Sequence, residues 1–211
     1  MKLIKNIINH FQKKPEFKLK SPKIIQEKTI NEFWENYLQN KIRKKEIRTG
    51  YTLKTVYKTS PSTMGIVREF PNPQYFQEYL SNAKEIRQKI MKCKPQYFEI
   101  QPIQIISTHH TNLRNYIMER VYPSMSIFAI RHVTQPQNNL MKMFLRKMKN
   151  KNVNFKELKQ ETEKGLDELS QLLAKNKINC SVPANNVLVL DYNPKTKKVL
   201  FGIVDWHDEY S

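Results

Sequence analysis

The sequence has few of the residues on which phosphate loops, zinc sites and disulfide frameworks depend. Its four glycines stand far apart, which excludes a glycine-rich loop that cradles phosphate with unobstructed backbone amides. Its two cysteines, Cys93 and Cys180, lack any metal-ligand spacing. We therefore expect no zinc site, no disulfide framework and a reducing compartment.

Long apolar runs are also absent. No run approaches the roughly 20 residues that a membrane-spanning helix needs, so we expect no transmembrane span. Hydrophobic residues nevertheless make up 39% of the 211 residues, with ten Tyr and ten Phe, which is too many for a disordered chain. The length suits one domain, or one domain with an arm.

Acidic residues are scarce relative to basic ones: 37 Lys and Arg stand against 19 Asp and Glu, a net charge of +18. The excess lies before residue 153, because residues 153–211 hold eight basic and nine acidic side chains. Such charge favours RNA or another polyanion as partner, and the absence of an RNA-reading motif favours contact with phosphates rather than bases. A lysine-rich solvated face is the alternative. The densest positions are Lys41, Arg43, Lys44, Lys45, Lys142, Arg146, Lys147, Lys149 and Lys151.

The first 14 residues predict an amphipathic helix that is basic and free of acidic side chains. These properties are typical of organelle-targeting segments, so we expect a mitochondrial matrix location, with a cytoplasmic location as the alternative. A helix that docks on the domain explains the same pattern. A second helix is expected at Ile30–Tyr37, and residues 1–49 together form a basic N-terminal arm.

The remaining chain predicts an α+β fold in two parts. Residues 50–122 hold two strands (51–57 and 64–70) that form a hairpin, a helix at 74–92, and strands at 97–107 and 115–121. Residues 123–211 hold helices with apolar faces, in which Met143 and Met148 are expected to fill the core. They end in a hairpin of two β-branched runs, 186–190 and 199–204.

The closing hairpin carries a recognisable pattern. Asn186 precedes an apolar strand, a turn and a second strand that ends in Ile203-Val204-Asp205-Trp206. The pattern resembles the catalytic loop and metal-binding hairpin of the protein-kinase-like superfamily, especially the aminoglycoside and choline kinases. The resemblance covers roughly residues 50–206 and implies a two-lobed core in which Asn186 and Asp205 hold Mg²⁺ on nucleotide phosphates. An unrelated α+β hairpin domain is the alternative.

The sequence departs from the family pattern in the catalytic loop and at the strand lysine, and it lacks the glycine-rich lid and the later helices of the second lobe. The catalytic aspartate lies five residues before the loop asparagine, and that position is Ser181, whose hydroxyl is not a base near neutral pH. The strand lysine that grips the phosphates falls near Arg68, and the resemblance implies Glu78 or Glu85 as its helix partner. The nucleotide-binding candidates are therefore Arg68, Glu85, Asn186 and Asp205, and no catalytic residue is expected.

These departures predict a non-catalytic kinase-like module. We expect a structural or interaction subunit of a large RNA-containing organellar assembly such as a mitochondrial ribosome, with neighbouring subunits covering a truncated second lobe. No cofactor is expected, with ATP and Mg²⁺ as the alternative if nucleotide still binds. An active phosphotransferase, helped by Asp191 or Asp208, and a basic accessory subunit of a mitochondrial membrane complex are the other hypotheses.

Overall fold

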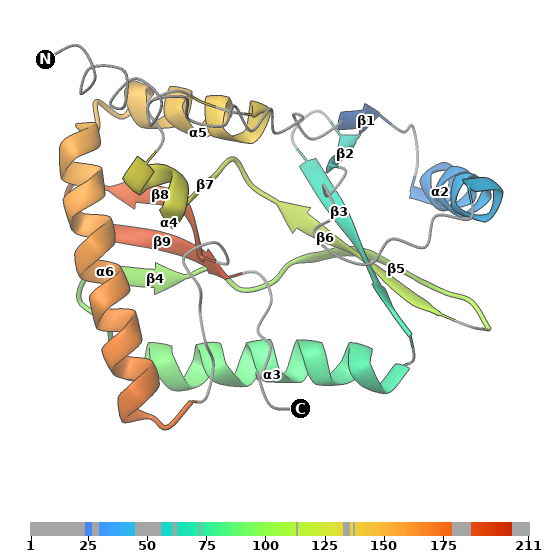
Figure 1. Cartoon of the computed structure of the whole chain (residues 1–211), viewed down its shortest axis with the longest axis horizontal. Coiled ribbons are helices and arrows are strands. Elements are labelled where there is room, and N and C mark those ends of the chain that lie inside the picture. The colour runs from blue at the N-terminus through green and yellow to red at the C-terminus, as the bar shows by residue number, and fades with distance from the viewer. Residues whose placement is uncertain are drawn as a thin grey trace, which may run out of the picture.

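The computed structural model describes residues 24–26, 30–44, 56–60, 63–71, 73–112, 114–132, 136, 138–178 and 187–203. These residues form an α+β fold with two sheets and five helices (Figure 1). No helix among them is both long and apolar enough to span a membrane.

The first sheet has the strand order β1-β2-β3-β6-β5. Its strands are β1 (Ile24–Gln26), β2 (Val56–Ser60), β3 (Thr63–Phe70), β5 (Ile105–His110) and β6 (Asn115–Val121). β1 runs parallel to β2, and the other neighbours are antiparallel. The predicted hairpin is present as β2–β3, but β2 overlaps the predicted strand 51–57 only at residues 56 and 57, and residues 51–55 lie outside the described residues. The predicted strand at 115–121 is confirmed as β6.

Two helices cover opposite faces of this sheet. Tyr116 and Met118 of β6 pack against α2 (Ile30–Lys44), whereas Ile117 packs against Phe76 and Tyr79 of α3 (Pro73–Lys92). Because successive residues of a strand point to opposite faces, α2 and α3 lie on opposite sides of the sheet. Both helices were predicted, although α2 extends beyond the predicted Ile30–Tyr37.

The second sheet has the order β4-β9-β8-β7. β8 (Val187–Asn193) and β9 (Lys198–Ile203) form the predicted antiparallel hairpin, joined by a turn at 194–197. β4 (Phe98–Ile100) pairs with β9 in parallel, and β7 (Met125–Ser126) pairs with β8.

The strand predicted at 97–107 is wrong as one element. The structure divides it into β4 of the second sheet and β5 of the first, with residues 101–104 between them. Pro102 lies in this connection and has no backbone N–H to continue a ladder. As a result β4, from the predicted 50–122 part, completes a sheet whose other strands come from the 123–211 part.

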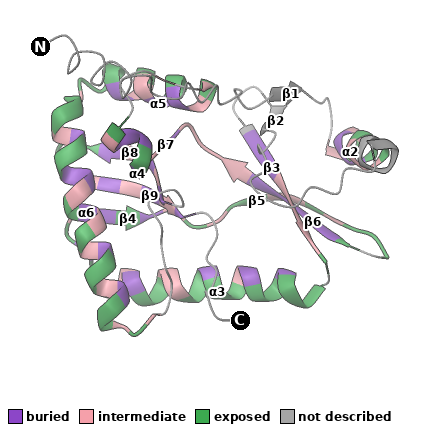
Figure 2. Ribbon diagram, in the orientation of Figure 1, coloured by how far each residue is buried: buried purple, intermediate pink, exposed green. Residues whose placement is uncertain are grey.

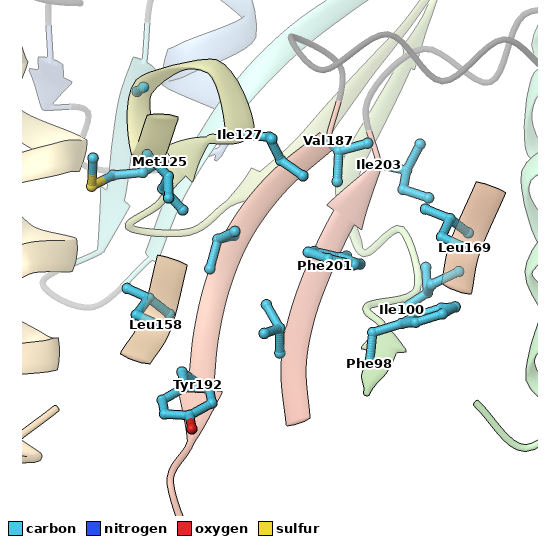
Figure 3. Packing of buried hydrophobic residues seen from close by; sticks show 14 of the residues in the cluster. Phe98, Ile100, Met125, Ile127, Leu158, Leu169, Val187, Tyr192, Phe201 and Ile203 are labelled. Carbon is cyan, nitrogen blue, oxygen red and sulfur yellow. The ribbon is translucent and has the colours of Figure 1, made fainter. Parts of the chain in front are cut away.

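The main core lies between the second sheet and three helices, α4 (Ile127–His132), α5 (Asn139–Asn150) and α6 (Phe155–Lys175). Figure 2 shows buried residues on the sides of α5 and α6 that face the sheet. Figure 3 shows Phe98 and Ile100 of β4 beside Phe201 of β9. α3 contributes Ala83 and Ile90 to this core, so this one helix packs on both sheets.

Gly165 permits the close approach of α6 to β9. A Cβ atom at this position would lie 3.1 Å from Cζ of Phe201, a ring that is completely buried. Since most real Cβ contacts are longer, only glycine fits here without displacing the ring. The axis of α6 therefore lies close to the strands of the closing hairpin.

Candidate functional site

Helix α5 carries the basic run 142–151, which contains no acidic side chain, and it is held by an N-terminal cap and by its apolar face. Asn138 caps its N-terminus, where the side-chain oxygen accepts a hydrogen bond from the Met141 N–H at 2.9 Å. Its apolar face buries Met141, Phe144 and Met148 in the main core. Met143, predicted to fill the core, is instead 40% exposed, because it lies about 140° around the helix from Met148.

Three basic side chains form a row on the exposed side of α5: Lys142, Arg146 and Lys149. We call this row the cationic stripe. The spacing of four and then three residues places them on one face, over roughly 10 Å of helix at 1.5 Å per residue. Within the described part of the chain, none of the three forms an ion pair.

The other two basic residues of the run are paired with the hairpin. Lys147 Nζ lies 2.8 Å from Oδ2 of Asp191, and Lys151 Nζ lies 2.6 Å from Oδ1 of the same carboxylate. The predicted anion-binding cluster on this helix is therefore divided into an unpaired stripe and a paired flank.

Arg68 lies on the face of the first sheet that α3 covers. Its Nε donates to Oε2 of Glu119 at 2.6 Å, and the Tyr79 hydroxyl donates to the same oxygen at 3.2 Å. The guanidinium also stacks on the Tyr79 ring, 5.2 Å from its centroid. The side chains of Arg68 and Glu119 are only 13% and 9% exposed, so this is a buried ion pair.

The helix glutamates named as partners of Arg68 are engaged elsewhere. Glu85 is exposed and pairs with Lys89, whose hydrogen bond and charge hold the pKa of Glu85 below its ordinary value. Glu78 accepts a hydrogen bond from Gln74. The ion pair of Arg68 therefore joins two strands of one sheet. Its acidic partner is Glu119 of β6, whereas a glutamate of the helix was expected.

Several candidate residues fall outside the described part of the chain. These are Lys45 of the first basic cluster and the whole nucleotide-binding pattern at Ser181, Asn186 and Asp205, together with the amphipathic segment 1–14. Lys41, Arg43 and Lys44 belong to α2, but their side chains are not described.

Sequence reasoning did not identify Asp191 as a partner of lysine or Glu119 as a partner of arginine. Asp191 follows four apolar residues of β8 and precedes Tyr192, so the signal was a carboxylate that interrupts an apolar strand. Glu119 interrupts the apolar run of β6 in the same way and is 7% exposed. A charged residue inside a buried strand requires a partner, and both have one.

Neither a metal site nor a relative adds to this geometry. Among the described residues, no three His, Cys, Asp or Glu side chains gather closely enough to hold a metal ion. No known protein family matches the sequence, and no curated protein matches it either.

Proposed function

We propose that this chain is a non-catalytic, kinase-like subunit that binds RNA phosphates through helix α5, within a larger organellar assembly such as a mitochondrial ribosome. The observation that carries the proposal is the cationic stripe. Three exposed cations lie in one row on a helix that is anchored by its opposite face. Such a row suits a polyanion whose charges are themselves in a row.

The order of elements supports the kinase-like part. A β2–β3 hairpin is followed by α3, then by β4, β5 and β6, and then by β7, three helices and the β8–β9 hairpin. The resemblance implies strands, a helix, two strands, two helices, a loop and a hairpin, so the order agrees apart from β4, β7 and the short helix α4. The resemblance also implies a helix after the first hairpin, and α3, with 20 residues, follows β3 and packs on the first sheet.

The environment of Arg68 supports the non-catalytic part. A residue that grips nucleotide phosphates has to offer its positive charge to them, whereas the charge of Arg68 is held by the buried carboxylate of Glu119. Releasing Arg68 would leave that carboxylate buried without its partner, which costs several kcal/mol. Ser181 also supports a non-catalytic role, because a serine stands where the family has the aspartate that accepts the proton.

Charge and dimensions support RNA as the partner. The stripe spans roughly 10 Å, a length over which one RNA strand presents two or three phosphates. The acid-poor segment 1–14 supports an organellar location, where ribosomal RNA is an abundant polyanion. Because phosphate contacts release counterions, such binding weakens steeply as salt rises.

The test is fluorescence anisotropy of the full chain with a labelled RNA hairpin over a series of salt concentrations. The variant carries Lys142→Glu, Arg146→Glu and Lys149→Glu. The matched control carries Lys84→Glu, Lys175→Glu and Lys195→Glu, three exposed lysines without ion pairs in the described residues. Lys175, like Lys149, lies in the last turn of its helix. The two variants therefore change the charge by the same amount, and each places one carboxylate at the negative end of a helix dipole.

We expect the stripe variant to lose RNA binding, and the slope of log K against log salt to fall by about two to three units. The control variant is expected to keep most of its RNA affinity and most of its salt slope. Equal losses in the two variants contradict a specific site on α5. If the stripe variant loses binding to phosphatidylserine vesicles while its RNA binding is unchanged, the partner of α5 is a lipid surface and not RNA.

A further inference from the structure

Asp191 and its two lysines form the boundary of the cationic stripe. We infer that Asp191 confines the RNA contact of α5 to the stripe by holding Lys147 and Lys151 on the hairpin, away from phosphate. This inference rests on the proposed function. It assigns Asp191 as a positioning residue, acting through two lysines rather than touching RNA itself.

The contacts occupy most of the hydrogen-bonding capacity of both ammonium groups. In addition to the carboxylate, Lys147 Nζ donates to the Leu190 carbonyl at 3.3 Å, and Lys151 Nζ donates to the Tyr192 carbonyl at 3.5 Å. Each ammonium has three N–H donors. Two of the three are therefore directed at the hairpin in each lysine.

The carboxylate is itself held in place by the backbone. Oδ1 of Asp191 accepts the Tyr192 N–H at 2.8 Å, and the β8–β9 register shifts between Val189 and Asp191. Such an irregularity re-aims the side chains that follow it. The Asp191 side chain is thereby presented to α5, with 25% of its surface exposed.

The paired flank lies on a different side of α5 from the stripe. At 3.6 residues per turn, Lys147 lies about 140° around the helix from Lys142, and the exposed side chain of Met143 lies between them. With Asp191 present, α5 offers one row of free cations. Without it, α5 offers two rows, and each freed ammonium retains enough exposure to meet a phosphate, since Lys147 and Lys151 are 40% and 38% exposed.

The test compares Asp191→Asn with Asp167→Asn in the same anisotropy experiment. Asp167 is an exposed residue of α6, so its replacement removes the same charge without freeing these lysines. We expect Asp191→Asn to bind RNA more tightly at low salt and to steepen the salt slope by one to two units, because two further phosphate contacts form. We expect Asp167→Asn to change the slope by much less.

A second variant tests the inference without altering Asp191. The double variant Lys147→Gln, Lys151→Gln removes the paired lysines, and we expect its salt slope to equal that of the unmodified chain. In that background, Asp191→Asn is expected to lose its effect. Circular dichroism on each variant shows that the fold is retained.

The outcomes separate the inference from the proposed function. If the stripe variant binds RNA as well as its control, the proposed function is wrong. If the stripe variant loses binding but Asp191→Asn behaves like Asp167→Asn, only the role of Asp191 is wrong. A reduced slope in the Lys147→Gln, Lys151→Gln variant also overturns the inference, because it shows that these lysines contact RNA in the unmodified chain.

Discussion

Arg68 and Glu119 form a diagonal ion pair across neighbouring strands of the first sheet. Arg68 stands opposite Ile117 and Glu119 stands opposite Ile66, yet Nε and Oε2 are 2.6 Å apart. Tyr79 of α3 donates to the same carboxylate. The pair thereby connects β3, β6 and α3 at one buried point.

Removing either partner of this pair is expected to destabilise the fold. Arg68→Met or Glu119→Leu alone leaves an uncompensated charge in a mostly buried site, and we expect each to lower the free energy of unfolding by about 3 kcal/mol. The double variant is expected to lose less than the sum of the two, which a double-mutant cycle in urea measures. Strictly additive losses would contradict the pairing. The control is Glu85→Gln, which removes the exposed ion pair with Lys89. It should leave the midpoint of urea unfolding unchanged.

Gly165→Ala is expected to destabilise the chain although alanine is the better helix former. The substitution gains about 1 kcal/mol in helix propensity, but the new methyl group meets the Phe201 ring at 3.1 to 3.2 Å and Cβ of Phe98 at 3.4 Å. Overpacking of a filled core costs about 1–3 kcal/mol, so we expect a net loss in thermal stability.

The control for this prediction is Gly202→Ala, in β9 directly after Phe201. There the methyl group meets the branched end of the Leu190 side chain at 3.0 to 3.2 Å, and this end can turn aside more readily than a buried ring. We expect a smaller loss than at Gly165. A larger loss at Gly202 would show that the approach of α6 to β9 does not limit the packing.

The ion pairs of Asp191 predict how stability depends on pH. Partial burial raises the pKa of Asp191, but the hydrogen bonds from Lys147, Lys151 and the Tyr192 N–H outweigh it and set the pKa below its ordinary value of 3.8. A lowered pKa in the folded state contributes stability that is complete above the ordinary value and is lost as the pH falls through the folded value. Urea unfolding should therefore show Asp191→Asn to be less stable from pH 7 down to about pH 5, with the difference disappearing only below the ordinary aspartate range. A difference that has already vanished at pH 5 would contradict the assignment.

Glu168 holds the segment that leads into β4. Its two carboxylate oxygens accept the backbone N–H groups of Gln96 at 2.8 Å and Tyr97 at 2.9 Å. In Glu168→Gln only one acceptor oxygen remains, and we expect a loss of about 1 kcal/mol with faster amide hydrogen exchange at Gln96 and Tyr97. Asp167→Asn, one residue away, is the control and should leave both amides protected. Unchanged exchange in Glu168→Gln would show that these amides are protected by other means.

Local patterns predicted most elements because each carries its own periodicity. The apolar faces of α5 and α6 recur at helical spacing, and their residues Phe144, Leu158 and Leu169 are completely buried. The closing hairpin was predicted from two β-branched runs and a turn, and Val187, Val189 and Val199 are likewise buried. These features depend on neighbours only a few residues away.

The errors concern relationships between distant residues. Nothing local shows that Phe98 pairs with Val199 while Ile105 pairs with Glu119, so one predicted strand became two in different sheets. β7 has two residues and exists through its pairing with β8. The family resemblance implied that the partner of Arg68 lies on a helix. In the structure the partner is Glu119, which lies on the adjacent strand.

The candidate site was predicted in part. The acid-free run of α5 drew attention to Lys142–Lys151, but the sequence does not show which of its cations are neutralised. That depends on Asp191, which lies 40 positions after Lys151 and 44 positions after Lys147. The structure reduces five candidate cations to three that are unpaired.

The parallel pairing of β4 with β9 has a consequence for the order of folding during synthesis. The strands β2, β3, β5 and β6 are all available once residue 121 has left the ribosome, whereas β4 waits for a partner about a hundred positions further along the chain. In that interval the side chains of Phe98 and Ile100 lack the strand that later covers them. We expect nascent chains arrested before β8 to expose this apolar edge and to be held by chaperones until the hairpin emerges.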